Sequence, residues 1–325
     1  MAEISDAIRP PVAEPKRRGT VADFIVRLVR EKPLGTVGAV IVLLLLLTGI
    51  FADMLAPYGY NEIHPAESLL APSAKYWMGT DNVGRDILSR VIYGARISLI
   101  VGLVATTISI IVSTVIGILS GFFGGKFDMV TQRFVDAWMC FPGIVILIVA
   151  VSIIGAGMWQ VIIVLGLQYG IAGSRIVRSA VIGIKENIYV EAARSIGCST
   201  SRMLVRHILP NIMPPIIILF STRVPAVILA EASLSFLGLG IPPPAPSWGG
   251  MLSGQGRSYM LLAPWMAFWP GLCLSIVVYG VNMFGDAVRD LLDPRLRGGL
   301  GRYTGVKRKT MRASGQGQGT RKRPG

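Results

Sequence analysis

Long stretches without a charged side chain dominate this sequence. Each is wide enough to cross a lipid bilayer as a helix, which takes about 17–25 residues. Four stretches hold no Asp, Glu, Lys or Arg, namely 33–52, 97–125, 137–174 and 258–285. A fifth stretch, 208–240, holds only two charged residues. The stretch 137–174 has room for two spans about the turn at 155–157. We therefore predict an all-α polytopic membrane protein with about six transmembrane helices.

The overall composition excludes a soluble globular fold. Hydrophobic residues make up 52% of the chain and charged residues 15%, and the mean hydropathy is +0.59. A transmembrane β-barrel is excluded because the apolar stretches are continuous, whereas barrel strands alternate apolar and polar residues. Cysteine occurs only at 140, 198 and 273, and these positions are far apart, which supports neither a disulfide framework nor a metal site. We expect no metal and no cofactor on this chain.

The distribution of Lys and Arg predicts the orientation of the spans. These residues gather in 9–32, in 175–206 and in the C-terminal segment, whereas the connections on the other side hold few of them. Because cytoplasmic loops carry the excess of Lys and Arg, both termini are predicted to be cytoplasmic. The organisation is then a cytoplasmic arm, a transmembrane domain and a basic, disordered cytoplasmic tail, at 1–33, 34–297 and 298–325. Trp248, Trp265 and Trp269 are expected at the outer membrane–water interface.

The net charge of +14 does not indicate nucleic-acid binding. The excess lies in the N-terminal arm and in the tail from Gly298, and both segments flank spans. Anionic lipid headgroups attract such basic flanks, by about 1 kcal/mol per residue near the surface. Membrane lipids, and not nucleic acid, are therefore the expected partners of these segments.

No segment carries recognisable catalytic chemistry. The sequence has no G-x-x-x-x-G-K-[ST] phosphate loop, so the chain is not expected to hydrolyse ATP by that route. The two histidines, His64 and His207, stand outside the predicted spans and far from each other, which suits neither a zinc site nor an intramembrane protease. We predict that the chain is not an enzyme.

A polar, helix-prone block separates two apolar stretches at about 175–210. It contains Glu191-Ala192-Ala193, then Gly197, and then Leu209-Pro210. Gly197 stands where two short helices would need a residue with positive φ. Ser199 can cap the second helix, and Pro210 is predicted to open the next membrane helix. An ordinary amphipathic loop helix would fit the same pattern.

In residue types and spacing this block resembles the EAA loop of ABC-importer permeases. In that family the loop forms the helix that a cytosolic ATPase binds. The resemblance implies ATPase-coupling roles for six residues, which are Glu191, Ala192, Ala193, Gly197, Leu209 and Pro210. His207 departs from the family pattern, which often has Ile at this position.

Further motifs resemble the peptide/nickel branch of these permeases, the dipeptide and oligopeptide permease C-type subunit. They follow in order over roughly 20–297 and include Met78-Gly79-Thr80-Asp81, Glu231-Ala232-Ser233-Leu234 and Asp293-Pro294-Arg295. The resemblance implies a type I ABC importer permease fold in a bacterial inner membrane. It also implies a second homologous permease, two cytosolic ABC ATPase subunits that bind ATP and Mg, and an extracytoplasmic substrate-binding protein. Relatives carry dipeptides, oligopeptides, glutathione or nickel chelates, and short peptides are the expected solutes.

Arg223 and Glu231 are the two charged residues in the stretch 208–240. An ionised side chain near mid-bilayer costs about 2.5 kcal/mol or more, so it usually faces the bundle interior or a water-filled cavity. Both are therefore candidate pathway residues, and a peptide carboxylate would suit Arg223. The alternative is a structural pair, either between the two residues or with the second permease. A self-contained secondary transporter or channel is the alternative function, because such proteins also place charges near the midplane.

Overall fold

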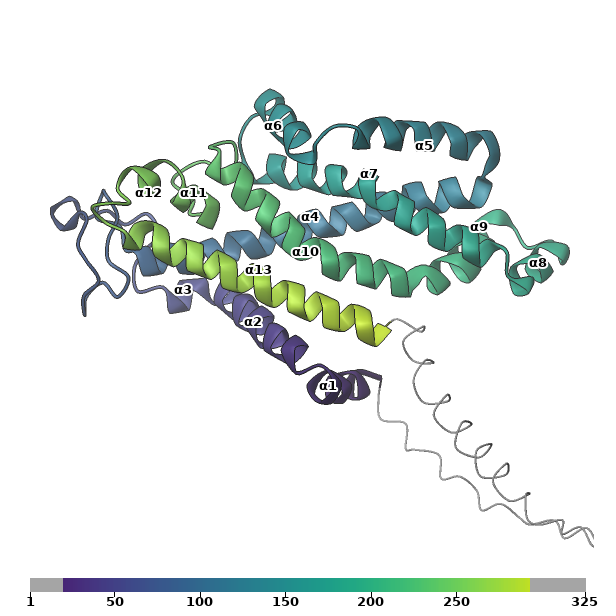
Figure 1. The fold of residues 1–325 in the computed structure, drawn as a ribbon, viewed down its shortest axis with the longest axis horizontal. Helices are drawn as coiled ribbons and strands as arrows, with labels where there is room; N and C mark the ends of the chain where they lie inside the picture. The colour runs from purple at the N-terminus through teal and green to yellow at the C-terminus, as the bar shows by residue number, and fades with distance from the viewer. Residues whose placement is uncertain (1–19, 293–325) are drawn as a thin grey trace, which may run out of the picture.

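The computed structural model of the protein describes residues 20–292, and this part of the chain is built from helices. Five helical stretches in it are long and apolar enough to cross a membrane, and they form one bundle (Figure 1). They contain α2 (Pro33–Ile50), α4 (Ile87–Phe123), α7 (Met158–Lys185), α10 (Met213–Phe236) and α13 (Trp265–Leu292). The prediction of an all-α polytopic protein is confirmed. The predicted tail 298–325 and residues 1–19 of the predicted arm lie outside the described residues.

One further apolar segment is a bent pair of helices, which counts as a sixth span only if the two helices are taken together. α5 (Gly125–Met139) and α6 (Gly143–Ile154) meet at an angle of 87°, and the break between them ends at Pro142, which has no N–H to continue a helix. α6 has 12 residues, about 18 Å at 1.5 Å per residue, and is too short to cross a bilayer alone. The turn at 155–157 is confirmed, but 137–154 is not the single straight span predicted, because the chain bends by 87° between α5 and α6.

Ion pairs explain how the charged helix α5 can lie among the spans. The Asp128 carboxylate accepts hydrogen bonds from Arg178 of α7, at 2.6 Å from Nε to Oδ1. Asp136 forms a second ion pair with Arg175, nearly one helical turn before Arg178. Each carboxylate of α5 that faces α7 thus has its own guanidinium partner, which lowers the cost of placing these charges beside apolar segments.

α4 is longer than its apolar stretch predicted because its N-terminal end is capped and its charges are paired. It begins at Ile87, where the Asp86 carboxylate accepts a hydrogen bond from the Ser89 N–H at 2.8 Å. Two turns further on, Arg96 pairs with Asp53 at 2.8 Å and donates to the Gly49 carbonyl at 2.9 Å. These contacts tie the end of α2 to the beginning of α4.

Small residues bring α4 and α7 into close contact along their length. A Cβ atom added at Gly170 would lie 2.7 Å from the Val112 Cβ, and one at Gly117 would lie 2.6 Å from the Val177 Cβ. The Ser113 hydroxyl donates to the Gly170 carbonyl at 2.8 Å across this contact. Side chains larger than hydrogen would push the two backbones apart, so the packing of the bundle depends on these glycines.

The end of the bundle at which α4 begins is covered by short helices and loops. They are α3 (Ala52–Leu55), η1 (Pro65–Glu67), α11 (Trp248–Leu252) and α12 (Gly254–Ser258). Trp248 was expected at the membrane–water interface, but it is buried, with 2% of its surface exposed, and its indole N–H donates to the Val91 carbonyl at 3.0 Å. Gly94 leaves the space for this ring, since a Cβ there would lie 2.7 Å from it.

The loop before α4 is held by its own polar contacts. Lys75 and Tyr76 both donate to the Glu67 carboxylate, which holds the pKa of that carboxyl below its usual value. The Trp265 indole N–H donates to the Thr80 carbonyl at 3.2 Å and joins this loop to the start of α13. This cap is therefore an ordered structure and not a loose connection.

Both ends of the described chain lie away from that cap. The chain enters through α1 (Thr20–Glu31), which packs through Leu28 against Ala287 and Leu291 near the end of α13. In Figure 1, α1 and the end of α13 lie toward the part of the molecule that carries α8 and α9, opposite α11 and α12. The two ends of residues 20–292 and the polar block near residue 190 thus share one side of the bundle.

Candidate functional site

The polar block near residue 190 forms an elbow that projects from the bundle between α7 and α10 (Figure 1). It begins with α8 (Ile188–Ser195) and continues, after a turn, with α9 (Thr200–Arg202). A π-helical segment, η2 (Met203–Ile208), and a 3-10 segment, η3 (Leu209–Ile212), then lead into α10. We refer to residues 186–212 as the elbow.

Gly197 makes the turn of the elbow, as expected from the sequence. Its φ is +80°, a conformation that side chains with a Cβ rarely adopt. The Gly197 N–H donates to the Arg194 carbonyl at 3.0 Å, and the Cys198 N–H donates to the Ala193 carbonyl at 3.1 Å. This pair of bonds is a Schellman motif, which ends α8 at a fixed angle.

The second half of the elbow differs from the prediction. Ser199 occupies the position before α9, but its side chain makes no capping hydrogen bond. Pro210 does not open the next membrane helix, because the helical chain runs without a break from Thr200 to Phe236. Pro210 cannot donate a hydrogen bond, and η2 and η3 take up this irregularity. The Asn211 side chain, one residue later, donates to the His207 carbonyl at 2.6 Å.

The inner face of the elbow is fixed to the bundle. Val190 and Ala193 of α8 are buried, with 1% and 7% of their surfaces exposed. They join one apolar cluster with Met203 of η2 and with Val177 and Val181 of α7. Leu209 packs against the same cluster, whereas Pro210 is exposed. The elbow is therefore packed against α7 and α10 as one unit.

The outer face of α8 carries an apolar stripe that nothing in residues 20–292 covers. Ile188 and Ile196 are 84% and 85% exposed, and Ala192 between them is also exposed. Residues spaced four apart lie on one face of a helix, so the three side chains form a continuous row. We refer to Ile188, Ala192 and Ile196 as the elbow stripe.

Charged residues surround the elbow stripe without partners in the described chain. Glu191 is exposed, and no hydrogen bond or ion pair to its carboxylate occurs within residues 20–292. The same holds for the guanidinium groups of Arg194, Arg202 and Arg206. Of the six coupling residues predicted, Glu191, Ala192, Gly197 and Pro210 are accessible to a partner. Ala193 and Leu209 instead pack inward.

The elbow stripe was only partly found from the sequence. Ala192 was singled out through the motif, whereas Ile188 and Ile196 were missed. Their spacing of four residues on either side of Ala192 was a usable signal, since apolar residues at this period on a polar loop helix indicate a contact face. Which of them face outward depends on the burial of Val190 and Ala193, which only the structure shows.

The structure does not bring Arg223 and Glu231 together. Glu231 is 1% exposed, and its carboxylate accepts a hydrogen bond from the Ser235 hydroxyl at 2.7 Å. The same hydroxyl accepts from the Ile241 N–H at 3.3 Å, so this group joins the end of α10 to the loop that follows. Arg223 lies instead over the Tyr169 ring of α7, with 5.3 Å between the guanidinium carbon and the ring centre.

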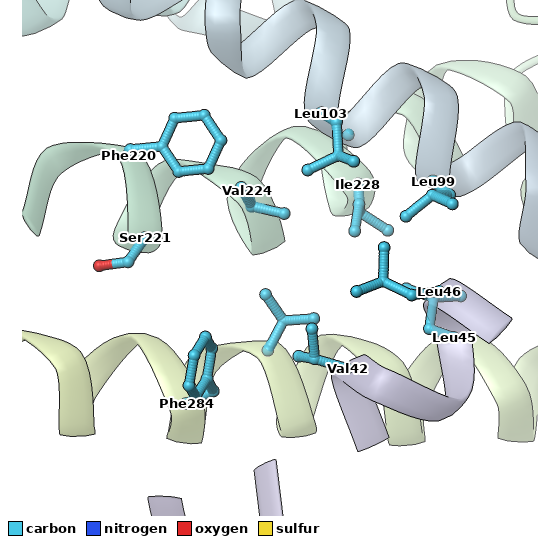
Figure 2. Close-up of a pocket in the computed structure, with 12 residues that line it drawn as sticks. Val42, Leu45, Leu46, Leu99, Leu103, Phe220, Ser221, Val224, Ile228 and Phe284 are labelled. Carbon is cyan, nitrogen blue, oxygen red and sulfur yellow. The ribbon is translucent and has the colours of Figure 1, made fainter. Parts of the chain in front are cut away.

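An apolar crevice lies between α2, α4, α10 and α13 (Figure 2). Its volume is about 140 Å³, and Ser221 supplies the one polar side chain among the twelve residues that line it. Leu45, Leu103 and Ile228 point into it from three different helices (Figure 2). Because a polar solute would leave its hydrogen-bonding groups unsatisfied there, this crevice is not a candidate for the transport site.

Comparisons with known proteins identify the family. Residues 113–298 match the model of the binding-protein-dependent transport system inner membrane component, and residues 22–72 match the N-terminal TM domain of oligopeptide transport permease C. The chain belongs to this family of inner membrane transport components. It is an ABC transporter permease subunit, a class distinct from the ATPase subunits of such systems.

Similar proteins cover most of the chain. It is 39% identical over 82% of its length to the dipeptide transport system permease protein DppC of Alkalihalophilus pseudofirmus, covering 88% of that protein. It is 38% identical over 89% of its length to the glutathione transport system permease protein GsiD of Escherichia coli, covering 95% of that protein. The corresponding values for the oligopeptide transport system permease protein OppC of Bacillus subtilis are 38%, 82% and 88%.

A solved structure supports the fold. An inward facing conformation of the MetNI methionine ABC transporter matches 64% of this chain and 98% of the matched chain, with a TM-score of 0.51 and 18% sequence identity. At this identity the likeness concerns the fold alone. It agrees with the type I importer permease fold that the sequence motifs implied.

Proposed function

We propose that this chain is one of two membrane-spanning permease subunits of an ATP-driven importer for short peptides or related small solutes. Its partners would be a second homologous permease, two cytosolic ABC ATPase subunits that hold ATP and Mg, and an extracytoplasmic substrate-binding protein. The relatives named for dipeptide, oligopeptide and glutathione transport support this range of solutes. The assembly lies in a bacterial inner membrane.

The elbow stripe is the observation that carries this proposal. Three exposed apolar side chains in a row on a projecting helix form a contact face for a groove on another protein. The accessible charges around it fit a polar rim. The ATPase subunit is the partner proposed for this face.

The charge distribution supports a cytoplasmic position for the elbow. Lys and Arg are concentrated in 9–32 and 175–206, and the ends of the described chain lie on the elbow side of the bundle. The positive-inside rule then makes both termini cytoplasmic and leaves the α11–α12 cap outside, where a binding protein would dock. The proposed organisation keeps a cytoplasmic arm at 1–33, which includes α1, before a transmembrane domain at 34–297.

The packing of the elbow supplies a mechanism for coupling. Closure of the ATPase subunits on ATP would displace α8, and the buried contacts of Val190 and Ala193 would pass the displacement to α7 and α10. α7 would carry α5 with it, because the ion pair between Arg178 and Asp128 joins the two helices. Movement of these helices would open the pathway alternately to the two sides of the membrane.

Arg223 and Glu231 remain proposed pathway residues, but their surroundings favour the pathway role for Arg223 more than for Glu231. The burial of Glu231 against Ser235 favours a structural role at the end of α10. Arg223 is partly exposed and has no acidic partner within residues 20–292, which favours a role in the pathway. Pro225, two residues further on, gives α10 a site at which it can bend.

Replacing Gly197 with valine tests the proposed coupling. A Cβ at this position meets no atom within 4 Å, so the substitution acts through the backbone, which a β-branched residue disfavours at φ +80°. We expect the turn to open and α8 to change its angle. Purification of the complex through a tag on this chain should then recover at least about tenfold less ATPase, an effect of about 1.4 kcal/mol on binding.

Gly183 provides the matched control for this test. It lies in α7 with ordinary helical backbone and with open space around it, so Gly183→Val should retain the ATPase subunits. Normal recovery of ATPase and normal uptake with Gly197→Val would count against the elbow as the coupling site.

A further inference from the structure

A groove lined by apolar and a few polar side chains runs between α6, α7 and α10, on a different side of α10 from the apolar crevice. Its volume is about 310 Å³. Gln168 and Tyr169 of α7 line it together with Ala226 and Ser233 of α10. It combines apolar walls with a few hydrogen-bonding groups, the composition typical of small-molecule sites.

Arg223 contacts Tyr169, one of the residues that line this groove. It precedes Ala226 by three residues, which is about one helical turn and the same face of α10. The Tyr169 ring holds the guanidinium in place by a cation–π contact at 5.3 Å, and the Tyr169 hydroxyl donates to the Ala226 carbonyl at 3.4 Å. The guanidinium is therefore positioned by the side chain that also lines the groove.

The hydrogen-bonding groups of Arg223 are unused within the described chain. Its Nε is buried and has no acceptor, and no carboxylate within residues 20–292 forms an ion pair with it. A guanidinium presents five N–H donors in a planar fork that matches a carboxylate. A cation kept unpaired in a membrane span is costly unless a ligand or partner supplies the missing charge.

Gln168 offers a second donor to the same groove. Its carbonyl oxygen accepts a hydrogen bond from the Trp138 indole N–H at 2.7 Å, which fixes the orientation of the amide. The amide nitrogen then lies toward Gly143, where an added Cβ would be 3.0 Å from it. No acceptor for this nitrogen occurs among the hydrogen bonds of residues 20–292.

We propose that Arg223, positioned by Tyr169, and Gln168 form a half-site for the carboxylate group of the transported solute. The inference rests on the proposed function and names the chemical feature that the permease itself recognises. The guanidinium binds the carboxylate, the Gln168 amide donates to a neighbouring oxygen, and the apolar walls of α6 and α10 contact the rest of the solute. The second permease completes the site from the open side of the groove.

The test compares two radiolabelled probes, dialanine and dialanine C-terminal amide. Uptake is measured in proteoliposomes that contain the complete complex, purified through this chain, with the same binding protein in every sample. Because the binding protein does not change, any difference between variants in the ratio of the two uptake rates must come from the permease. Arg223→Gln should lower dialanine uptake by about tenfold or more, the effect of losing a hydrogen bond to a charged group, and should leave uptake of the amide near the original rate.

Arg223→Lys and Tyr169→Leu extend the test. The lysine variant keeps the charge and should retain most of the preference for dialanine. The leucine variant removes the ring that positions the guanidinium and should lose part of the preference for dialanine over the amide. Both variants should retain the ATPase subunits. Retention would separate a failure of the half-site from a failure of the proposed function.

Two results would overturn the half-site. If Arg223→Gln retains the ATPase subunits but loses uptake of both probes equally, Arg223 serves assembly or pairs with an acidic residue of the second permease. If Arg223→Gln changes the uptake of neither probe, the groove does not recognise the carboxylate of the solute.

Discussion

Replacing Ile188 and Ile196 together with aspartate is expected to separate the ATPase subunits from this chain. Both side chains are more than four-fifths exposed and belong to the elbow stripe. Each isoleucine contributes about 1.5–3 kcal/mol when fully buried against a partner, so loss of both should weaken binding by about a hundredfold or more. The measurement is the amount of ATPase recovered with a tag on the permease, together with ATP-driven uptake.

The control for this prediction is Leu261→Asp. Leu261 is 93% exposed, and it lies near the start of α13, at the end of the bundle that carries α11 and α12. The chemical change is similar, but the position is on the side away from the elbow. We expect normal recovery of the ATPase with this variant. Equal recovery with the double aspartate variant would show that the stripe does not bind the ATPase.

Replacing Gly170 with leucine is expected to disrupt the bundle itself. The first added carbon would already lie 2.7 Å from the Val112 Cβ and 3.1 Å from the Ser109 carbonyl oxygen. Overpacking of this kind costs about 1–3 kcal/mol, and more where two backbones must separate. The hydrogen bond from Ser113 to the Gly170 carbonyl would be strained at the same time. The thermal unfolding midpoint of the purified protein should fall clearly.

Gly183→Leu is the matched control, because it places the same side chain on the same helix. A Cβ at Gly183 meets nothing within 4 Å. Its unfolding midpoint should stay close to that of the unchanged protein. If Gly170→Leu is equally stable, α4 and α7 do not pack as closely as the structure indicates.

Much of the fold could be predicted from the sequence because charge-free stretches of sufficient length have few alternatives in a membrane. The positions of α2 and α13 and the turn before α7 followed from this rule. The rule fails at α5, which contains two aspartates and still lies against α7, because Arg175 and Arg178 of α7 pair with them. Such pairing joins residues far apart in the sequence, and composition alone does not reveal it.

In the elbow, too, a feature set by local residues could be predicted from the sequence, whereas features set by the wider structure could not. The turn at Gly197 could be predicted, because a positive φ between two short helices is a local requirement. The continuation of the helix through Pro210 could not, since it depends on a π-helical segment that one proline does not specify. The burial of Trp248 likewise depends on Gly94 of α4, more than 150 residues earlier in the chain.

ATP-dependent uptake in proteoliposomes tests most directly whether the transport energy enters through the elbow. The vesicles contain either this chain alone or the chain with the subunits that copurify with it, and ATP is enclosed while radiolabelled dialanine and the binding protein are added outside. Uptake is predicted only with the copurified ATPase subunits and enclosed ATP, and it should be lost with the double aspartate variant of Ile188 and Ile196. Rapid uptake of dialanine by this chain alone, without ATP, would contradict the account.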